Sequence, residues 1–346
     1  MPIEDNHMGS AAAGGSAATT RQALAFLINP FSGGGIGREV YRHLPEILDS
    51  FGLPRDAWSA ELTDPDKLEE QTDHLLSCAQ KVIAVGGDGT IGFVLNRLRL
   101  HVEGGNEIGL IPLGTGNDLG RALGIYHIYD QKGLLACVQR LLKAPVQYFD
   151  LWRVNGDATL ASYISVGMDA AILHDFDQAR KEGRLPKGAF WNKLYYLKAT
   201  CGRTTSRLGA GTLLRVYRTG IRREIPLEGA LCCLVANIDS YAAGAHPFPE
   251  GRIDDKLLEV MVFRHFWQYA LVVTVSRTLP KVIRTLRRFL PIYQAEKVEL
   301  ILPDGAHAQL DGEDLTHRVH TDKRLLIENA GQANLLDLRQ AAFSLF

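Results

Sequence analysis

The sequence predicts two domains of different class, an α/β domain with an open parallel sheet followed by a mainly antiparallel β-sandwich. Within the first 146 residues, three apolar strand-like segments each run into a glycine-rich turn and then into a helical pattern. That order is typical of a parallel sheet with crossover helices. From about residue 147, strand-like segments follow one another with few helices between them, which favours an antiparallel sandwich.

Length and composition are compatible with this prediction. The chain has 346 residues, enough for two domains, and its net charge of −1 disfavours nucleic-acid binding. Five cysteines form no CxxC pair, which fits a reducing compartment. The most apolar later stretch, Trp267 to Val275, is too short to span a bilayer.

The expected domain organisation has four parts. Residues 1–21 are rich in Gly, Ala, Ser and Thr without the pattern of a signal peptide, and we expect a disordered leader. Residues 22–146 form the α/β domain and 147–334 the β-sandwich. Residues 335–346 are expected to be a C-terminal tail.

The first glycine-rich turn follows the strand predicted at 23–29. It reads PFSGGGIG from Pro30 to Gly37 and leads into a helix predicted at 38–51. It is neither a Walker motif nor a GxGxxG motif. Alone it is equally compatible with a flexible loop.

The second turn, Gly86-Gly87-Asp88-Gly89-Thr90, follows the buried-strand pattern of residues 82–85. A helix that begins here directs its first N–H groups at whatever lies beyond the end of the strand, the usual position of a phosphate. Asp88 would repel a phosphate unless a divalent cation or a transferable proton is involved. The alternative is a plain strand-to-helix turn with a capping Asp.

The third turn runs from Leu113 to Gly120 after a strand predicted at 107–112, and it includes Asn117 and Asp118, which can cap the next helix. The carboxyl ends of parallel strands meet at one edge of a sheet. The three turns together therefore predict a pocket for a polyphosphate.

Two features of the second domain stand out. Asp311-Gly312-Glu313 follows a short strand, as a polar hairpin turn or as a site for a catalytic carboxylate. A helix predicted over 266–290 carries cationic and apolar residues at helical spacing from Thr274 onward. That pattern fits a helix on an anionic membrane surface, or a helix packed on the sandwich with a solvated basic face. A second helix is expected from Ala170 to about residue 181, continuing over 191–199.

Several blocks together resemble the diacylglycerol kinase family over about residues 23–330. They are Asn29-Pro30 with its glycines, GGDGTIGFVLN from Gly86, PLGTGND from Pro112, SVGMDA from Ser165, NKLYY from Asn192 and QLDGE from Gln309. The GGDGT motif alone is shared with NAD kinases and sphingosine kinases. Ser240 to Phe248 also matches a block of the family, with no role that its residues predict.

The resemblance implies transfer of the ATP γ-phosphoryl group to diacylglycerol, giving phosphatidic acid, with Mg²⁺ as cofactor. The candidate ATP-binding residues are Asn29, Pro30, Ser32, Gly33, Thr63, Gly86, Gly87, Gly89, Thr90, Gly114, Thr115, Asn117 and Asp118. In the family's pattern the contacts that begin at Gly87 extend to Phe93. Glu313 is expected to be the base, with Asp311 as the reserve candidate, and Asp88 to hold Mg²⁺. Asp254 and Asp255 match a structural Mg²⁺ site of related enzymes, or form an exposed turn.

The alternatives are the same chemistry on sphingosine or ceramide, an NAD kinase, and an inactive nucleotide-binding lipid sensor. The lipid substrate implies a cytoplasmic protein that associates peripherally with membranes. The sequence does not predict an oligomeric state.

Overall fold

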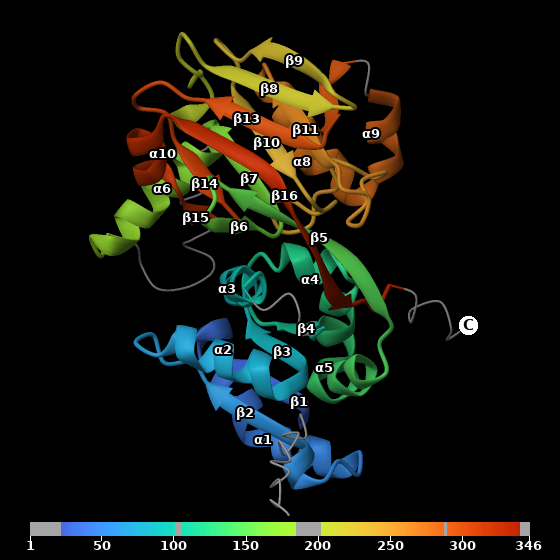
Figure 1. The fold of residues 1–346 in the computed structure, drawn as a ribbon. Coiled ribbons are helices and arrows are strands. Elements are labelled where there is room, and N and C mark those ends of the chain that lie inside the picture. Colours follow the sequence, from blue (N-terminus) through green and yellow to red (C-terminus); the bar gives the residue numbers. More distant parts are fainter. Residues whose placement is uncertain (1–21, 101–104, 185–201, 287–288, 340–346) are drawn as a thin grey trace, which may run out of the picture.

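The structure, a computed structural model, describes residues 22–100, 105–184, 202–286 and 289–339 (Figure 1). The leader predicted at 1–21 and the insert at 185–201, which includes the NKLYY block, lie outside the described residues. Two lobes are stacked along the long axis of the molecule, with the glycine-rich turns of the first lobe beneath the second (Figure 1).

The first lobe contains a four-stranded parallel sheet in the order β2-β1-β3-β4. Its strands are β1 (Gln22–Ile28), β2 (Trp58–Leu62), β3 (Ala79–Gly86) and β4 (Glu107–Pro112). Its helices are α1 (Ile36–Ser50), α2 (Leu68–Cys78), α3 (Asp88–Leu98), α4 (Asp118–Ala122) and α5 (Ile125–Leu142). In α1, Val40, Leu44 and Leu48 recur every four residues and are buried in the core, which explains why this segment forms an amphipathic helix.

The second lobe contains two sheets that pack on a shared core. One has the order β12-β11-β10-β7-β14-β15, and all of its pairs are antiparallel. Its strands are β7 (Tyr163–Gly167), β10 (Cys232–Ala236), β11 (Leu258–Phe263), β12 (Ile292–Ala295), β14 (Ala308–Leu310) and β15 (Glu313–Asp314). The predicted fold class, an α/β domain followed by an antiparallel β domain, is confirmed.

The other sheet continues the sheet of the first lobe through β16 (Arg324–Leu336). One end of β16 runs parallel to β4, whereas its other end is antiparallel to β13. The additional strands are β5 (Val146–Val154), β6 (Ala158–Leu160), β8 (Leu213–Arg218), β9 (Ile221–Pro226) and β13 (Lys297–Ile301). One mixed sheet of ten strands therefore spans both lobes.

The end of β16 differs from the tail expected at 335–346. Leu335, Leu336 and Leu338 are buried in the core of the first lobe. The apolar pattern of these residues predicts burial without showing which sheet receives them, because the partner strand β4 lies more than 200 residues earlier in the sequence.

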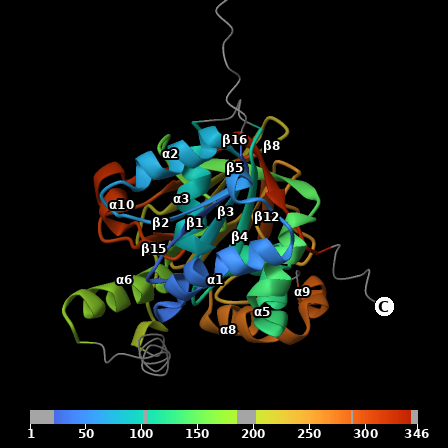
Figure 2. The same cartoon turned by 90° about the horizontal axis from the view of Figure 1, so that it is seen from below.

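Three helices described in the second lobe cover one side of its antiparallel sheet. They are α6 (Met168–Lys181), α8 (Phe266–Thr278) and α9 (Pro280–Leu286), which lie on the same side of the lobe in Figure 2. Met168, Val272 and Ile283 belong to one core cluster beneath them. On the other side, α10 (Thr316–Asp322) contacts β14 and β16.

The single helix expected at 266–290 is divided in two. It is interrupted at Leu279, where φ and ψ are −132° and 63°. Pro280 follows, and a proline ring blocks the carbonyl of the preceding turn and supplies no N–H. No helix among the described residues is long and apolar enough to cross a membrane.

Candidate functional site

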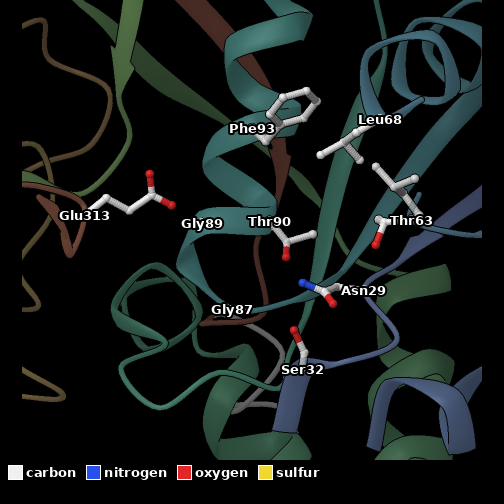
Figure 3. Close-up of a pocket in the computed structure, with 10 residues that line it drawn as sticks. Asn29, Ser32, Thr63, Leu68, Gly87, Gly89, Thr90, Phe93 and Glu313 are labelled. Atoms are coloured by element: carbon white, nitrogen blue, oxygen red, sulfur yellow. The ribbon is translucent and has the colours of Figure 1, made fainter. Parts of the chain in front are cut away.

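A pocket of about 370 Å³ opens at the carboxyl ends of the first-lobe strands (Figure 3). It is lined by Leu27, Asn29, Ser32, Thr63, Leu68, Gly87, Gly89, Thr90, Phe93 and Glu313. Most of these residues belong to the predicted set. Leu27 and Leu68 were not predicted, because single leucines in a strand and a helix carry no motif.

The first turn has a backbone that requires glycine. Gly33, Gly34 and Gly35 have φ angles of +64°, +70° and +107°, which residues with a Cβ rarely adopt. A Cβ on Gly37 would lie 2.0 Å from the Asn29 carbonyl oxygen. The Phe31 N–H donates to Asn29 Oδ1 at 3.0 Å, so the side chain of Asn29 helps to shape the turn.

The second and third turns pack directly on each other. A Cβ on Gly114 would lie 2.7 Å from Gly87 Cα, and a Cβ on Gly33 would lie 3.2 Å from the Leu113 carbonyl oxygen. Asn117 closes the third turn from inside, because its amide group bonds both the N–H and the carbonyl of Gly114 at 2.8 and 2.6 Å. The expectation that three separate turns meet at one sheet edge agrees with this packing.

The remaining members of the predicted nucleotide set surround the pocket without lining it. Pro30 is buried under the first turn, and Thr115 is exposed on the third. A Cβ on Gly86 would lie 2.3 Å from Thr90 Oγ1. Gly33, Gly86 and Gly114 therefore shape the backbone of the turns beside the pocket.

The carboxylate of Asp88 lies between the second and third turns. Its two oxygens accept the backbone N–H groups of Asp118 and Leu119, each at 3.3 Å. Burial and, to a smaller extent, repulsion from Asp118 raise the pKa of Asp88 from 3.8 to about 6. Asp118 does not line the pocket, and Ser240 and Ala243 of the second lobe donate to its side chain.

The second lobe contributes the hairpin turn between β14 and β15. Asp311 and Gly312 both have positive φ, +50° and +85°, as a two-residue hairpin of type I′ requires. The Asp311 carboxylate accepts the backbone N–H groups of Ala161, Ser162 and Tyr163 at 2.7–2.9 Å. Burial outweighs these donors and raises its pKa to about 7.

Glu313 projects from this turn toward the first turn of α3, as Figure 3 shows. Its side chain is exposed. A Cβ on Gly89 would lie 2.8 Å from Glu313 Oε1. The missing side chain at Gly89 thus leaves the space that Glu313 occupies at the edge of the pocket.

Asp254 and Asp255 lie in the loop before β11, apart from the pocket. Arg252 donates to Asp254 at 3.0 and 3.2 Å and lowers its pKa. Asp255 accepts the Leu257 N–H at 3.0 Å. Within the described residues no group of three or more His, Cys, Asp or Glu forms a metal site, so magnesium at Asp254 and Asp255 stays a prediction.

Two family models together match most of this chain. The model for the diacylglycerol kinase catalytic domain matches residues 23–154, and the model for the diacylglycerol kinase accessory domain matches residues 159–314. The chain belongs to the diacylglycerol kinase family, as its motifs predicted.

Several curated relatives are diacylglycerol kinases by name. The chain is 28% identical to an eye-specific diacylglycerol kinase of Drosophila melanogaster over 68% of its length. It is 29% identical to diacylglycerol kinase 1 of Arabidopsis thaliana over 74% of its length, and 28% identical to mouse diacylglycerol kinase theta over 84%. The matched parts are only 18%, 37% and 32% of those relatives.

The fold is also shared with a solved structure. The crystal structure of a diacylglycerol kinase from Bacillus anthracis superposes with a TM-score of 0.64 at 18% identity. The superposition covers 92% of this chain and 98% of that one. At this identity the likeness establishes the two-lobed fold.

Proposed function

We propose that this protein is an ATP-dependent lipid kinase that phosphorylates 1,2-diacylglycerol to phosphatidic acid. The observation that carries the proposal is the position of Glu313, an exposed carboxylate from the second lobe at the rim of a pocket built by glycine turns of the first. A nucleotide pocket and a free proton acceptor then share one opening. Membership of the family supplies the reaction.

The glycine turns are the phosphate-binding part of the pocket. Phosphoryl transfer depends mostly on positioning and on neutralising charge. The first turn of α3 begins beside the pocket at Gly87 and Gly89, where the positive end of the helix dipole favours anions. Thr90, Ser32 and Asn29 add polar side chains at the same opening.

The residues present fit a magnesium ion at Asp88. Asp88 is a partly buried carboxylate beside a second one, Asp118, and its pKa is raised mainly by burial and to a smaller extent by the charge of Asp118. Mg²⁺ binds through one or two carboxylates together with substrate phosphates. When bound, it would neutralise developing charge on those phosphates, and Asp88 would orient it.

Glu313 is assigned as the general base. As the lipid hydroxyl oxygen bonds to the γ-phosphorus and the bond to the ADP oxygen breaks, the hydroxyl proton moves to the Glu313 carboxylate. Asp311 is less suited to this task because three backbone N–H groups already occupy its oxygens. Asp311 holds the turn on which Glu313 stands.

Peripheral membrane docking through α8 and α9 is part of the proposal. Trp267, Leu279 and Phe289 are 53%, 58% and 62% exposed around these helices, and Arg277 and Lys281 are exposed beside them. Cationic and apolar side chains together bind anionic lipid surfaces. The opposite faces of α8 and α9 pack on the sheet through Val272 and Ile283, as the alternative of a helix packed on the sandwich predicts, and the exposed faces are the ones proposed for docking. Arg287 and Arg288 lie outside the described residues.

The test is a kinase assay with separate acceptors. Purified protein receives labelled ATP and Mg²⁺ with vesicles of diacylglycerol, with sphingosine, with ceramide or with NAD. We expect label in phosphatidic acid alone and none with Asp88→Ala. Label in NADP or in a sphingolipid phosphate would replace the proposal with the corresponding kinase, and no label in any acceptor would favour a lipid sensor.

Docking is tested by sedimentation with vesicles. Leu279→Asp combined with Phe289→Asp should weaken binding to phosphatidylserine-containing vesicles about tenfold or more, because apolar area is lost and negative charge is added. Ile221→Asp, at an exposed apolar residue of β9 (69% exposed), is the matched control. If both variants sediment equally with the vesicles, α8 and α9 are not the membrane-docking surface.

A further inference from the structure

The loop Ser240–Ala245 of the second lobe has an unusual backbone. Tyr241 and Ala245 exchange two backbone hydrogen bonds of 2.9 and 2.8 Å and close the loop. Inside it, Ala242, Ala243 and Gly244 have φ angles of +49°, +62° and +109°. Two successive alanines in the left-handed region are uncommon, and such strain persists only where surrounding contacts impose it.

The strained backbone presents donors to one carboxylate of the first lobe. The Ser240 hydroxyl donates to Asp118 Oδ1 at 2.6 Å and the Ala243 N–H donates to Asp118 Oδ2 at 3.2 Å. The Tyr163 hydroxyl lies 3.5 Å from the same Oδ2. Asp118 is 2% exposed and Ser240 is fully buried, so water cannot replace these donors cheaply.

Asp118 in turn contacts Asp88 through its backbone. The N–H groups of Asp118 and Leu119 donate to the two oxygens of Asp88. The loop therefore fixes the residue whose amide orients the carboxylate proposed to hold Mg²⁺. Asp118 is buried and Asp88 is partly buried, and two neighbouring carboxylates repel each other. The arrangement does not favour folding by itself, which points to a role in placing Asp88.

The loop also has contacts on its other side. The Arg277 guanidinium of α8 donates to the Ala242 carbonyl, and the His246 N–H donates to Ser276 Oγ at 2.8 Å. The Tyr241 hydroxyl donates to Asp169 at 2.6 Å. These contacts hold the strained loop against α8 and the sheet, so the second lobe provides a fixed support for Asp118.

We propose that the Ser240–Ala245 loop is a positioning element for catalysis, in which Ser240 and the Ala243 N–H hold Asp118 and thereby aim Asp88 at the phosphates. This inference rests on the proposed kinase function. In this proposal Asp118, which the sequence predicts as a nucleotide ligand, instead connects the two lobes by accepting hydrogen bonds from the second lobe. The proposal also gives a role to the family block at Ser240 to Phe248.

The test begins with Ser240→Ala, which removes the shortest of the hydrogen bonds that the second lobe donates to Asp118. We expect kcat for phosphatidic acid formation to fall about 10- to 100-fold, the usual effect of a hydrogen bond to a charged group. KM for ATP should stay within about threefold, because Ser240 lies outside the pocket. Thr212→Ala, which removes another buried hydroxyl of the second lobe bonded to Gly209, is the control with unchanged kcat.

A double-variant cycle separates positioning from general destabilisation. If Ser240 acts through Asp118, then Ser240→Ala should add less than about twofold to the kcat loss of Asp118→Asn. A kcat loss in the double variant equal to the product of the two single-variant losses would overturn the inference. A kcat of Ser240→Ala equal to that of an active wild type would overturn it as well, and would leave the kinase proposal standing.

Amide hydrogen exchange provides a readout that needs no kinase activity. In Ser240→Ala the peptide that contains Asp118 and Leu119 should exchange about tenfold faster than in wild type and in Thr212→Ala. Unchanged exchange would overturn the inference. A wild type that phosphorylates no lipid overturns the proposed function instead, and faster exchange in the variant would then still show that the loop holds Asp118.

Discussion

The two turns that carry the proposed chemistry hold their carboxylates in opposite ways. In the Gly86–Thr90 turn, the Asp88 carboxylate is held by two backbone N–H groups. Burial raises its pKa. In the Asp311–Asp314 turn, Glu313 is exposed, and the neighbouring Asp311 provides the fixed contacts. A carboxylate that holds a cation benefits from a rigid position. A carboxylate that acts as a general base must reach the hydroxyl group of the lipid and then release the proton to water.

Glu313→Gln tests the second turn and should have the largest effect. The amide cannot take a proton, so kcat should fall about 10²- to 10⁴-fold. KM for ATP should change little because the pocket keeps its shape. Steady-state kinetics with diacylglycerol vesicles measure both constants. An increase in KM with an unchanged kcat would assign Glu313 to substrate binding.

Asp88→Asn tests the first turn. Loss of the negative charge should lower kcat about 10²- to 10³-fold, the usual cost of removing a preorganised electrostatic group. The dependence of the rate on Mg²⁺ concentration should also shift to higher concentration. An unchanged magnesium dependence would mean that another residue holds the ion.

The pH dependence of stability should report on Asp311 when wild type and Asp311→Asn are compared. Its pKa in the folded protein, about 7, lies above the ordinary value of 3.8, so the folded state favours the protonated form. The stabilising contribution is complete below about pH 4 and is lost as the pH rises through 7, on the order of a few kcal/mol. Urea unfolding without Mg²⁺ or nucleotide should show this decline in wild type and a smaller one in Asp311→Asn.

Gly89→Ala should have the smallest effect and should report on the contact between the turns. The new Cβ would lie 2.8 Å from Glu313 Oε1 and must displace that flexible side chain. We expect kcat to fall about tenfold, because small displacements of reacting groups are costly. Gly92→Ala is the matched control, since its Cβ would lie 4.0 Å from Asp311 Oδ2. Equal kcat values in both variants would contradict a role for this contact.

Much of the first lobe could be predicted because its signals are local. The strand patterns and the glycines of the three turns sit next to each other in the chain, and the rule for parallel strands brings the turns to one edge. Leu27 and Leu68 escaped prediction because a pocket wall made of ordinary aliphatic residues has no sequence signature. Asn117 and Asp118 were expected at the nucleotide, whereas their side chains bind Gly114 and the second lobe.

The sequence by itself determined the family, the fold class and the turns that bear Asp88 and Glu313. Local hydrophobic periodicity and turn chemistry specify those features. Only the tertiary structure showed that β16 joins the two lobes into one sheet, that Asp311 supports its own turn, and that Ser240 reaches Asp118. These contacts connect residues more than 100 positions apart, and no local pattern encodes which distant donor a buried carboxylate will find.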